Sequence, residues 1–314
     1  MSARTRAVVA ALCAVVVTGC IEGFDPPSLI TKSRPIGARV EVAGDADRPW
    51  PAPGEVAAVR WLVVGPEEPD PLTWGFVVCP AILTPTGDRF CAGEPFGFGF
   101  SAAPAVAEPT LSFTVPPAEA LGPLEEILVL GIICVDGTPA IDMEPFDVRC
   151  EGDGAQGTLV TFAIPLALEG RTNRSPTIPA DAITFDDGAW AEPVGTVPLE
   201  GCASVAGGTE LPSVRAGADP VVLHLQPVAS DREIYTVGDQ MGRETLTFSH
   251  FVTSGELERQ FSVVDDDTAD VTVEWTPPAV EDVSADGTRV RFHFVVRDGR
   301  GGIAWTAREL CVAP

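Results

Sequence analysis

Three histidines are the residues of this sequence best suited to catalytic metal chemistry. His224, His250 and His293 are its only histidines, and three imidazoles with one water form a common catalytic zinc site. Each histidine lies in a segment with the alternating pattern of a β-strand, in which successive side chains point to opposite faces. This alternation places the three rings on different faces. We therefore expect solvated or singly bonded histidines, no shared metal site and no catalytic residue.

An acidic turn is the second candidate for chemistry. Calcium takes six to eight oxygen ligands from carboxylates and carbonyls, and loops at one end of a β-sandwich can supply them. The candidate ligands are carboxylates of one predicted turn and of the turn expected to face it: Asp265, Asp266, Asp267, Asp270 and Asp298. Their spacing is not that of an EF-hand loop. Calcium is the only cofactor that the sequence suggests, and a plain solvated turn is the simpler expectation.

Residues 96–100 (FGFGF) alternate phenylalanine with glycine. Such a stretch could expose an aromatic patch for a ligand. The expectation we prefer is that the phenylalanines fill a core and that the glycines allow neighbouring strands to approach closely.

Motifs of the common hydrolases and nucleotide-binding enzymes are absent. The sequence has no GxSxG elbow, HExxH helix, phosphate loop or dinucleotide fingerprint. We therefore expect a non-catalytic binding or structural module. The alternatives are a metal-dependent hydrolase that uses loops of the C-terminal part, and an accessory subunit of an envelope secretion or transport complex.

The N-terminus has the layout of a secretory signal peptide. Arg4 and Arg6 precede an apolar run from Ala7 to Val17, which is shorter than the roughly 20 residues of a membrane-spanning helix. Small residues then lead into Cys20. This ending resembles the lipobox of bacterial lipoproteins, which implies cleavage after residue 19 and lipidation, as with palmitate, of Cys20. Ordinary cleavage near Gly19, with Cys20 left as a plain thiol, is the alternative.

Six cysteines follow Cys20. An even number in an exported chain predicts disulfides, because the compartment is oxidising. Six cysteines allow fifteen pairings. Their order along the chain favours Cys79–Cys91, Cys134–Cys150 and Cys202–Cys311.

The charge of the chain limits its partners. The formal net charge is −25, so the surface repels phosphate backbones and nucleic-acid binding is not expected. Anionic lipid headgroups are repelled too, so the expected membrane link is the acyl chains on Cys20. Lipoproteins retained at the inner membrane typically carry aspartate after the lipidated cysteine. Ile21 stands there, and the resemblance therefore implies the outer membrane, on its periplasmic face or at the cell surface.

Short strand patterns separated by proline, glycine and acidic turns recur along the chain, and they predict an all-β sandwich or barrel. The clearest predicted strands are 38–42, 56–64, 74–79, 110–115, 127–135, 158–168, 221–225, 244–251, 269–275, 288–296 and 303–312. A polar stretch at 171–176 reads as a linker. The expected organisation is a signal peptide at 1–19, a tether at 20–35, and two antiparallel β-sandwich domains at 36–170 and 177–314.

A wider resemblance comes from three stretches. Residues 271–278 (VTVEWTPP) and 291–305 (RFHFVVRDGRGGIAW) resemble the last strands of immunoglobulin-like or PKD-like domains of exported bacterial proteins. Residues 130–139 (LGIICVDGTP), with Trp61 on an earlier strand, are similar to lipoproteins of myxobacterial type. The resemblance implies immunoglobulin-like sandwiches in the cell envelope, and it carries no catalytic residue. An unidentified protein partner in the envelope is the expectation that follows from the non-catalytic role.

Overall fold

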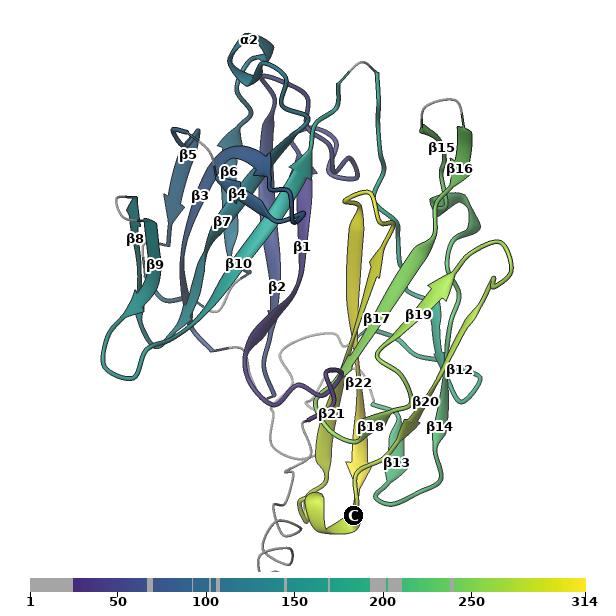
Figure 1. Ribbon diagram of the computed structural model, residues 1–314. Coiled ribbons are helices and arrows are strands. Elements are labelled where there is room, and N and C mark those ends of the chain that lie inside the picture. Colours follow the sequence, from purple (N-terminus) through teal and green to yellow (C-terminus); the bar gives the residue numbers. More distant parts are fainter. Residues whose placement is uncertain are drawn as a thin grey trace, which may run out of the picture.

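The structure is a computed structural model in which residues 25–66, 70–91, 93–101, 103–105, 108–143, 146–168, 170–192, 202, 211–237 and 240–314 are described. It confirms the all-β prediction (Figure 1). The helical elements among these residues are one turn each: α2 (Ala118–Leu121), η1 (Ala229–Asp231) and η2 (Val280–Asp282). Within the described ranges, no helix has the length and apolar character needed to cross a membrane. Cys20 and the predicted signal peptide lie outside these ranges.

In the N-terminal half, two antiparallel sheets pack face to face. The three-stranded sheet has the order β1 (Arg34–Val42), β2 (Val56–Val64), β6 (Thr110–Thr114). The five-stranded sheet has the order β10 (Gln156–Pro165), β7 (Glu126–Val135), β3 (Leu72–Leu83), β4 (Arg89–Cys91), and β5 (Gly97–Phe100) also pairs with β3. Both sheets supply the core between them, where the Trp61 and Phe76 rings stack with centroids 4.1 Å apart.

The C-terminal half has a second pair of sheets, and each of these has five strands. One has the order β12 (Gly188–Ala189), β11 (Ile183–Phe185), β14 (Val221–Leu225), β20 (Val271–Thr276), β18 (Glu256–Leu257). The other has the order β13 (Ser213–Arg215), β22 (Ile303–Ala313), β21 (Thr288–Arg297), β17 (Leu246–Val252), β19 (Phe261–Val264). Trp190, Trp275 and Phe292 lie in the core between them.

Two hairpins stand outside these sheets: β8 (Thr138–Met143) with β9 (Phe146–Glu151), and β15 (Ile234–Val237) with β16 (Gln240–Arg243). Every strand expected from the sequence is present, with shifts of a few residues at the ends. The strands that the sequence did not indicate are mostly short ones at sheet edges and in the hairpins, where two to six residues show no clear period.

A third apolar cluster, which we call the joint, connects the two halves. It contains buried Ile30, Ile36, Val64, Phe251, Val295 and Ile303, with Leu62 and Trp305 packed against them. The alternation of β21 predicts one buried and one solvated face. The expectation of a solvated face is wrong, because His293 and Val295 on that face are also buried. The cause is the packing of β1, which covers part of this face.

Polar contacts reinforce the joint around Arg300. Its guanidinium lies 4.9 Å from the centre of the Trp50 ring and 4.7 Å from that of Tyr235, and Nη1 donates a 2.6 Å hydrogen bond to buried Glu244. The Trp50 indole N–H donates to the Arg300 carbonyl oxygen at 2.7 Å. Arg300 therefore connects the N-terminal half, through Trp50, with two residues of the C-terminal half.

Two segments expected to be simple connections are packed into the structure. In the predicted tether, Ser28 and Ile30 are buried, and the Ile30 N–H bonds to the Val252 carbonyl at 2.8 Å. In the predicted linker 171–176, Asn173 is buried and donates to Asp298 at 2.7 Å. Both segments are ordered because their polar groups find partners in the C-terminal half. The proposed division into two domains remains a prediction.

The structure contains the disulfides Cys79–Cys91, Cys134–Cys150 and Cys202–Cys311, the pairs that the order along the chain favours. The first two close short loops in the N-terminal half, with sequence separations of 12 and 16. The third has a separation of 109 and ties Cys202 to β22.

These loop lengths predict unequal contributions to stability. The chain-entropy model gives about 3 kcal/mol for a loop of ~15 residues and about 4.7 kcal/mol for one of ~100 residues. Replacing Cys202 and Cys311 together with serine should therefore lower the free energy of unfolding by more than the same replacement of Cys79 and Cys91. Urea unfolding of the two double variants checks this, and an equal or smaller loss for the long loop would contradict it.

Candidate interaction surface

The acidic turn after β19 is held by hydrogen bonds within the protein. Asp265 accepts the backbone N–H groups of Asp267 and Thr268, each at 2.9 Å. Asp266 accepts a 2.8 Å hydrogen bond from Arg232, and the Arg243 guanidinium lies 3.5 Å from the same oxygen. Two cations thus already face the side chain that was a candidate calcium ligand.

Asp298, the candidate from the second turn, is buried and organises the β21–β22 hairpin. Its carboxylate accepts hydrogen bonds from the Asn173 amide at 2.7 Å and from the backbone N–H groups of Arg300 and Gly302 at 2.7 and 2.9 Å. Burial raises the pKa of this carboxyl above its usual value. Asp270 is exposed. Among the described residues, no group of three or more histidine, cysteine or carboxylate side chains could hold a metal ion. Calcium binding by the acidic turn remains a prediction.

The three histidines point to different places, as their alternation predicts. His250 is buried in the C-terminal core, with its ring 6.1 Å from Phe294 and Nε2 3.1 Å from the Ser262 hydroxyl. His293 lies on the opposite face of the same sheet. His224 belongs to β14 in the other sheet and is partly exposed. The structure does not bring the three rings together.

The phenylalanine–glycine stretch forms one side of an exposed apolar surface. Phe96 packs against the N-terminal core as expected. The expectation is wrong for Phe98 and Phe100, which are 53% and 49% exposed. The proposed role of the glycines is supported, because a Cβ atom at Gly99 would clash with Leu111.

The exposed apolar side chains lie on the side of the five-stranded sheet that faces away from the N-terminal core. We call it the outer face. The cross-strand register aligns its apolar side chains, which are Val77, Phe98, Phe100, Leu130, Ile132 and Leu159. Val77 and Ile132 form a buried floor, whereas Leu159 is 64% exposed. Ile82, Leu83 and Phe90 add exposed apolar area around the β3–β4 turn.

Two hairpins border the outer face, and a disulfide fixes each one. The β3–β4 hairpin is held by Cys79–Cys91 and by an ion pair between Arg89 and Glu126 at 2.7 Å. The β8–β9 hairpin is held by Cys134–Cys150. It reaches β10, because a Cβ atom at Gly157 would clash with the Cys150 sulfur. Figure 1 shows the two hairpins at different places along the sheet.

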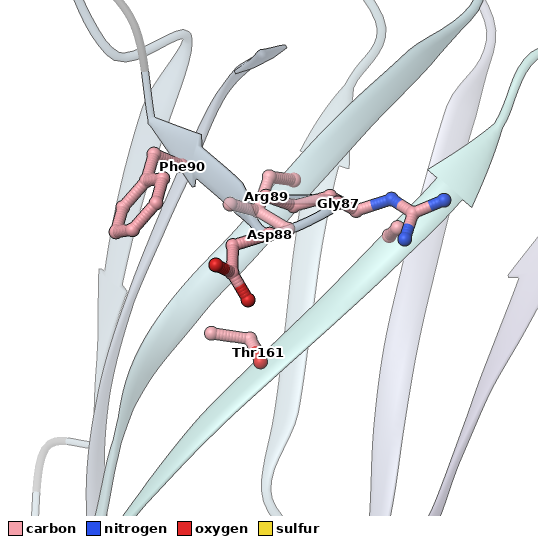
Figure 2. Close-up of a pocket in the computed structure, with 7 residues that line it drawn as sticks. Gly87, Asp88, Arg89, Phe90 and Thr161 are labelled. Atoms are coloured by element: carbon pink, nitrogen blue, oxygen red, sulfur yellow. The ribbon is translucent and has the colours of Figure 1, made fainter. Parts of the chain in front are cut away.

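A hollow of about 440 Å³ lies where the β3–β4 hairpin crosses towards β10. Its lining residues are Gly87, Asp88, Arg89, Phe90, Leu128, Thr161 and Ala163. Figure 2 shows Asp88 and Phe90 on the hairpin and Thr161 on β10 across from Asp88. Leu128 and Ala163 supply apolar atoms to this open hollow, and Asp88, Arg89 and Thr161 supply polar ones.

The border of the outer face is acidic. On the β8–β9 hairpin, Arg149 binds three carboxylates, with distances of 2.6 Å to Asp142, 2.6 Å to Asp147 and 2.8 Å to Glu151. Asp136 and Asp153 are exposed in the turns beside the first residues of β10. This excess of carboxylates favours a positively charged partner.

Sequence reasoning did not identify the outer face, although a signal was present. Residues 127–135 form an almost continuous apolar run instead of an alternating one. Such a run indicates a strand with apolar side chains on both faces. One face of this strand packs in the N-terminal core, and the other belongs to the outer face.

Comparison with protein-family models finds no match for the chain, and comparison with characterised proteins also finds none.

Burial of two histidines has a consequence for stability. Desolvation, with a smaller contribution from a nearby arginine, lowers the pKa of His250 to about 4 and that of His293 to about 3. In the unfolded chain both rings titrate near pH 6.5. Between these values the unfolded state binds more protons than the folded state. Stability must therefore fall as the pH falls from 6.5 towards 4.

His293→Leu should reduce this pH dependence. Between pH 6.5 and 4.5 the wild type should lose on the order of 2–3 kcal/mol of unfolding free energy through each buried ring, and the variant should lose correspondingly less. Urea unfolding at both pH values measures the difference. His224→Gln is the matched control because that ring is partly exposed. An unchanged pH dependence in His293→Leu would refute the conclusion that the buried His293 ring contributes to it.

Proposed function

We propose that this chain is a non-catalytic lipoprotein of the bacterial cell envelope that binds another protein through the outer face. The observation that carries the proposal is the exposure of Phe98, Phe100 and Leu159 together on one rigid sheet. Exposed apolar side chains grouped on one face with a polar border are typical of protein interaction sites.

Rigidity supports the interaction role. The floor of the outer face is part of the same strands that form the N-terminal core, and the two bordering hairpins are cross-linked to those strands. A partner would therefore meet a preformed surface, which lowers the entropic cost of association.

The membrane part of the proposal rests on the sequence. The resemblance of the first twenty residues to a lipoprotein signal makes Cys20 the attachment site, with the outer membrane as the expected location. An accessory role in an envelope complex is compatible with the outer face. No set of described residues favours the metal-dependent hydrolase considered as an alternative.

Lipidation is tested by labelling the full chain with palmitate in a bacterium that processes lipoproteins. The wild type should be labelled and should sediment with membranes, whereas Cys20→Ser should carry no label. Cys13→Ser is the matched control, because Cys13 lies within the apolar run of the signal and should leave labelling intact. Equal labelling of Cys20→Ser and wild type would exclude Cys20 as the attachment site.

The interaction role is tested with a photo-crosslinking amino acid placed at residue 98 of the full chain in cells. It should give a discrete crosslinked protein, because Phe98 is half exposed on the outer face. The same amino acid at Phe261, which is 59% exposed in the C-terminal half, is the control and should not give that product. The same product from both positions, or none from residue 98, would argue against the proposal.

A further inference from the structure

Among the described sheets, the longest free edge lies beside the outer face. In the described sheets of three or more strands, β10 and β1 are the only end strands longer than five residues. β1 lies in the joint, where Ile36 is buried and its carbonyl accepts a hydrogen bond from Arg297. β10 bonds only to β7 among the described strands, and most of residues 156–161 are exposed.

The direction of the main-chain groups of β10 follows from its ladder. The Leu166 N–H bonds to the Glu125 carbonyl at 2.9 Å, in the same register that pairs Val160 with Gly131. In an antiparallel pair, hydrogen-bonded and non-hydrogen-bonded positions alternate. The even-numbered residues of β10 therefore bond to β7, and the odd-numbered residues direct their N–H and C=O groups away from the sheet.

The odd-numbered positions also carry the side chains of the outer face. Leu159 and Thr161 are exposed there, and Thr161 lines the hollow shown in Figure 2. Pro165 occupies another odd-numbered position, where the missing N–H of proline costs no ladder bond. The free edge and the apolar surface thus meet along the same residues.

The composition of β10 is unusual for a free edge. Its sequence, QGTLVTFAIP, contains no charged residue. Proteins commonly protect long edges with charged side chains, because an unpaired edge is a template for another strand. The exposed edge at residues 156–161 lacks charged side chains, so another strand can add to it.

We infer that β10 binds an extended, basic segment of the partner protein as an additional antiparallel or parallel strand, with alternate apolar side chains of that segment against Leu159, Thr161 and the adjoining hollow. Main-chain hydrogen bonds would supply affinity and the hollow would supply specificity, as in other cases of strand addition. The inference rests on the proposed function and adds the form of the partner.

The acidic border determines the charge of the segment. Asp136 and Asp153 flank the start of β10, and three further carboxylates surround Arg149 on the adjacent hairpin. A basic strand is attracted to this border. A second copy of this chain is a poor occupant, because its net charge is also −25 and like charges would meet across the edge.

The test uses the full chain and a peptide of alternating valine and lysine, as long as β10. Peptide binding should slow amide hydrogen exchange at Gly157, Leu159 and Thr161, whose N–H groups are directed outward. The amides of Thr158 and Val160, already bonded to β7, are the internal reference and should change little. A matched peptide with glutamate in place of lysine should bind at least about tenfold more weakly.

A pair of variants at one position separates strand addition from simple apolar contact. Thr161→Pro removes an outward N–H without removing a bond to β7, and it should weaken peptide binding by about tenfold or more. Thr161→Val keeps the N–H and should bind like the wild type. Exchange of the β3 and β7 amides verifies that both variants are folded.

Several outcomes would overturn the inference. Equal binding by Thr161→Pro and Thr161→Val, or binding of the lysine peptide without protection of the odd-numbered amides, would exclude strand addition while leaving the outer face as an interaction surface. Preference for the glutamate peptide would exclude a basic occupant. Protection of the same amides without peptide, together with concentration-dependent dimerisation, would make a second copy the occupant. Loss of crosslinking from residue 98 in cells is a separate result, which bears on the proposed function.

Discussion

The burial of both faces of the β21–β22 sheet is the constraint on which the arrangement of the molecule depends. One face belongs to the C-terminal core, and the other packs against β1 and the segment before it. Such a sheet cannot stand alone in water, because its second face would expose Val295 and Ile303. Contacts of Arg300 with Trp50 and Tyr235 add directional interactions to this packing. The two halves therefore stabilise each other through a shared apolar cluster.

The five-stranded sheet of the N-terminal half has the same property and a different outcome. It too is apolar on both faces, but hairpins and the Phe100 ring cover only the middle of its second face, where Val77 and Ile132 are buried. Phe98, Phe100 and Leu159 stay exposed. The alternating strand β21 thus packs its second face inside the protein, whereas the apolar run of β7, which does not alternate, lies in a sheet whose second face keeps exposed apolar side chains.

Much of the fold could be predicted from the sequence, and the surface could not. Strands such as 56–64 and 221–225 agree with the structure because period-2 patterning and turn residues act locally. The disulfide pairs followed from order along the chain. Burial of His293, of Asn173 and of Ile30 depended on contacts between distant segments, which no local pattern encodes. Exposure of Phe98 and Phe100 depended on which face of β5 met the core, and an alternating Phe–Gly stretch leaves that choice open.

Docking of the residues around Ile30 into the joint places buried residues of the described part close to Cys20 along the chain. With lipid on Cys20, only residues 20–28 would separate the bilayer from the first buried side chain of the described part, that of Ser28. A fully extended segment of this length spans at most roughly 25–30 Å. The protein would then search for its partner by diffusion in the plane of the membrane, at a nearly constant height. A partner strand that could reach β10 only from deep in the periplasm or far outside the cell would not meet it.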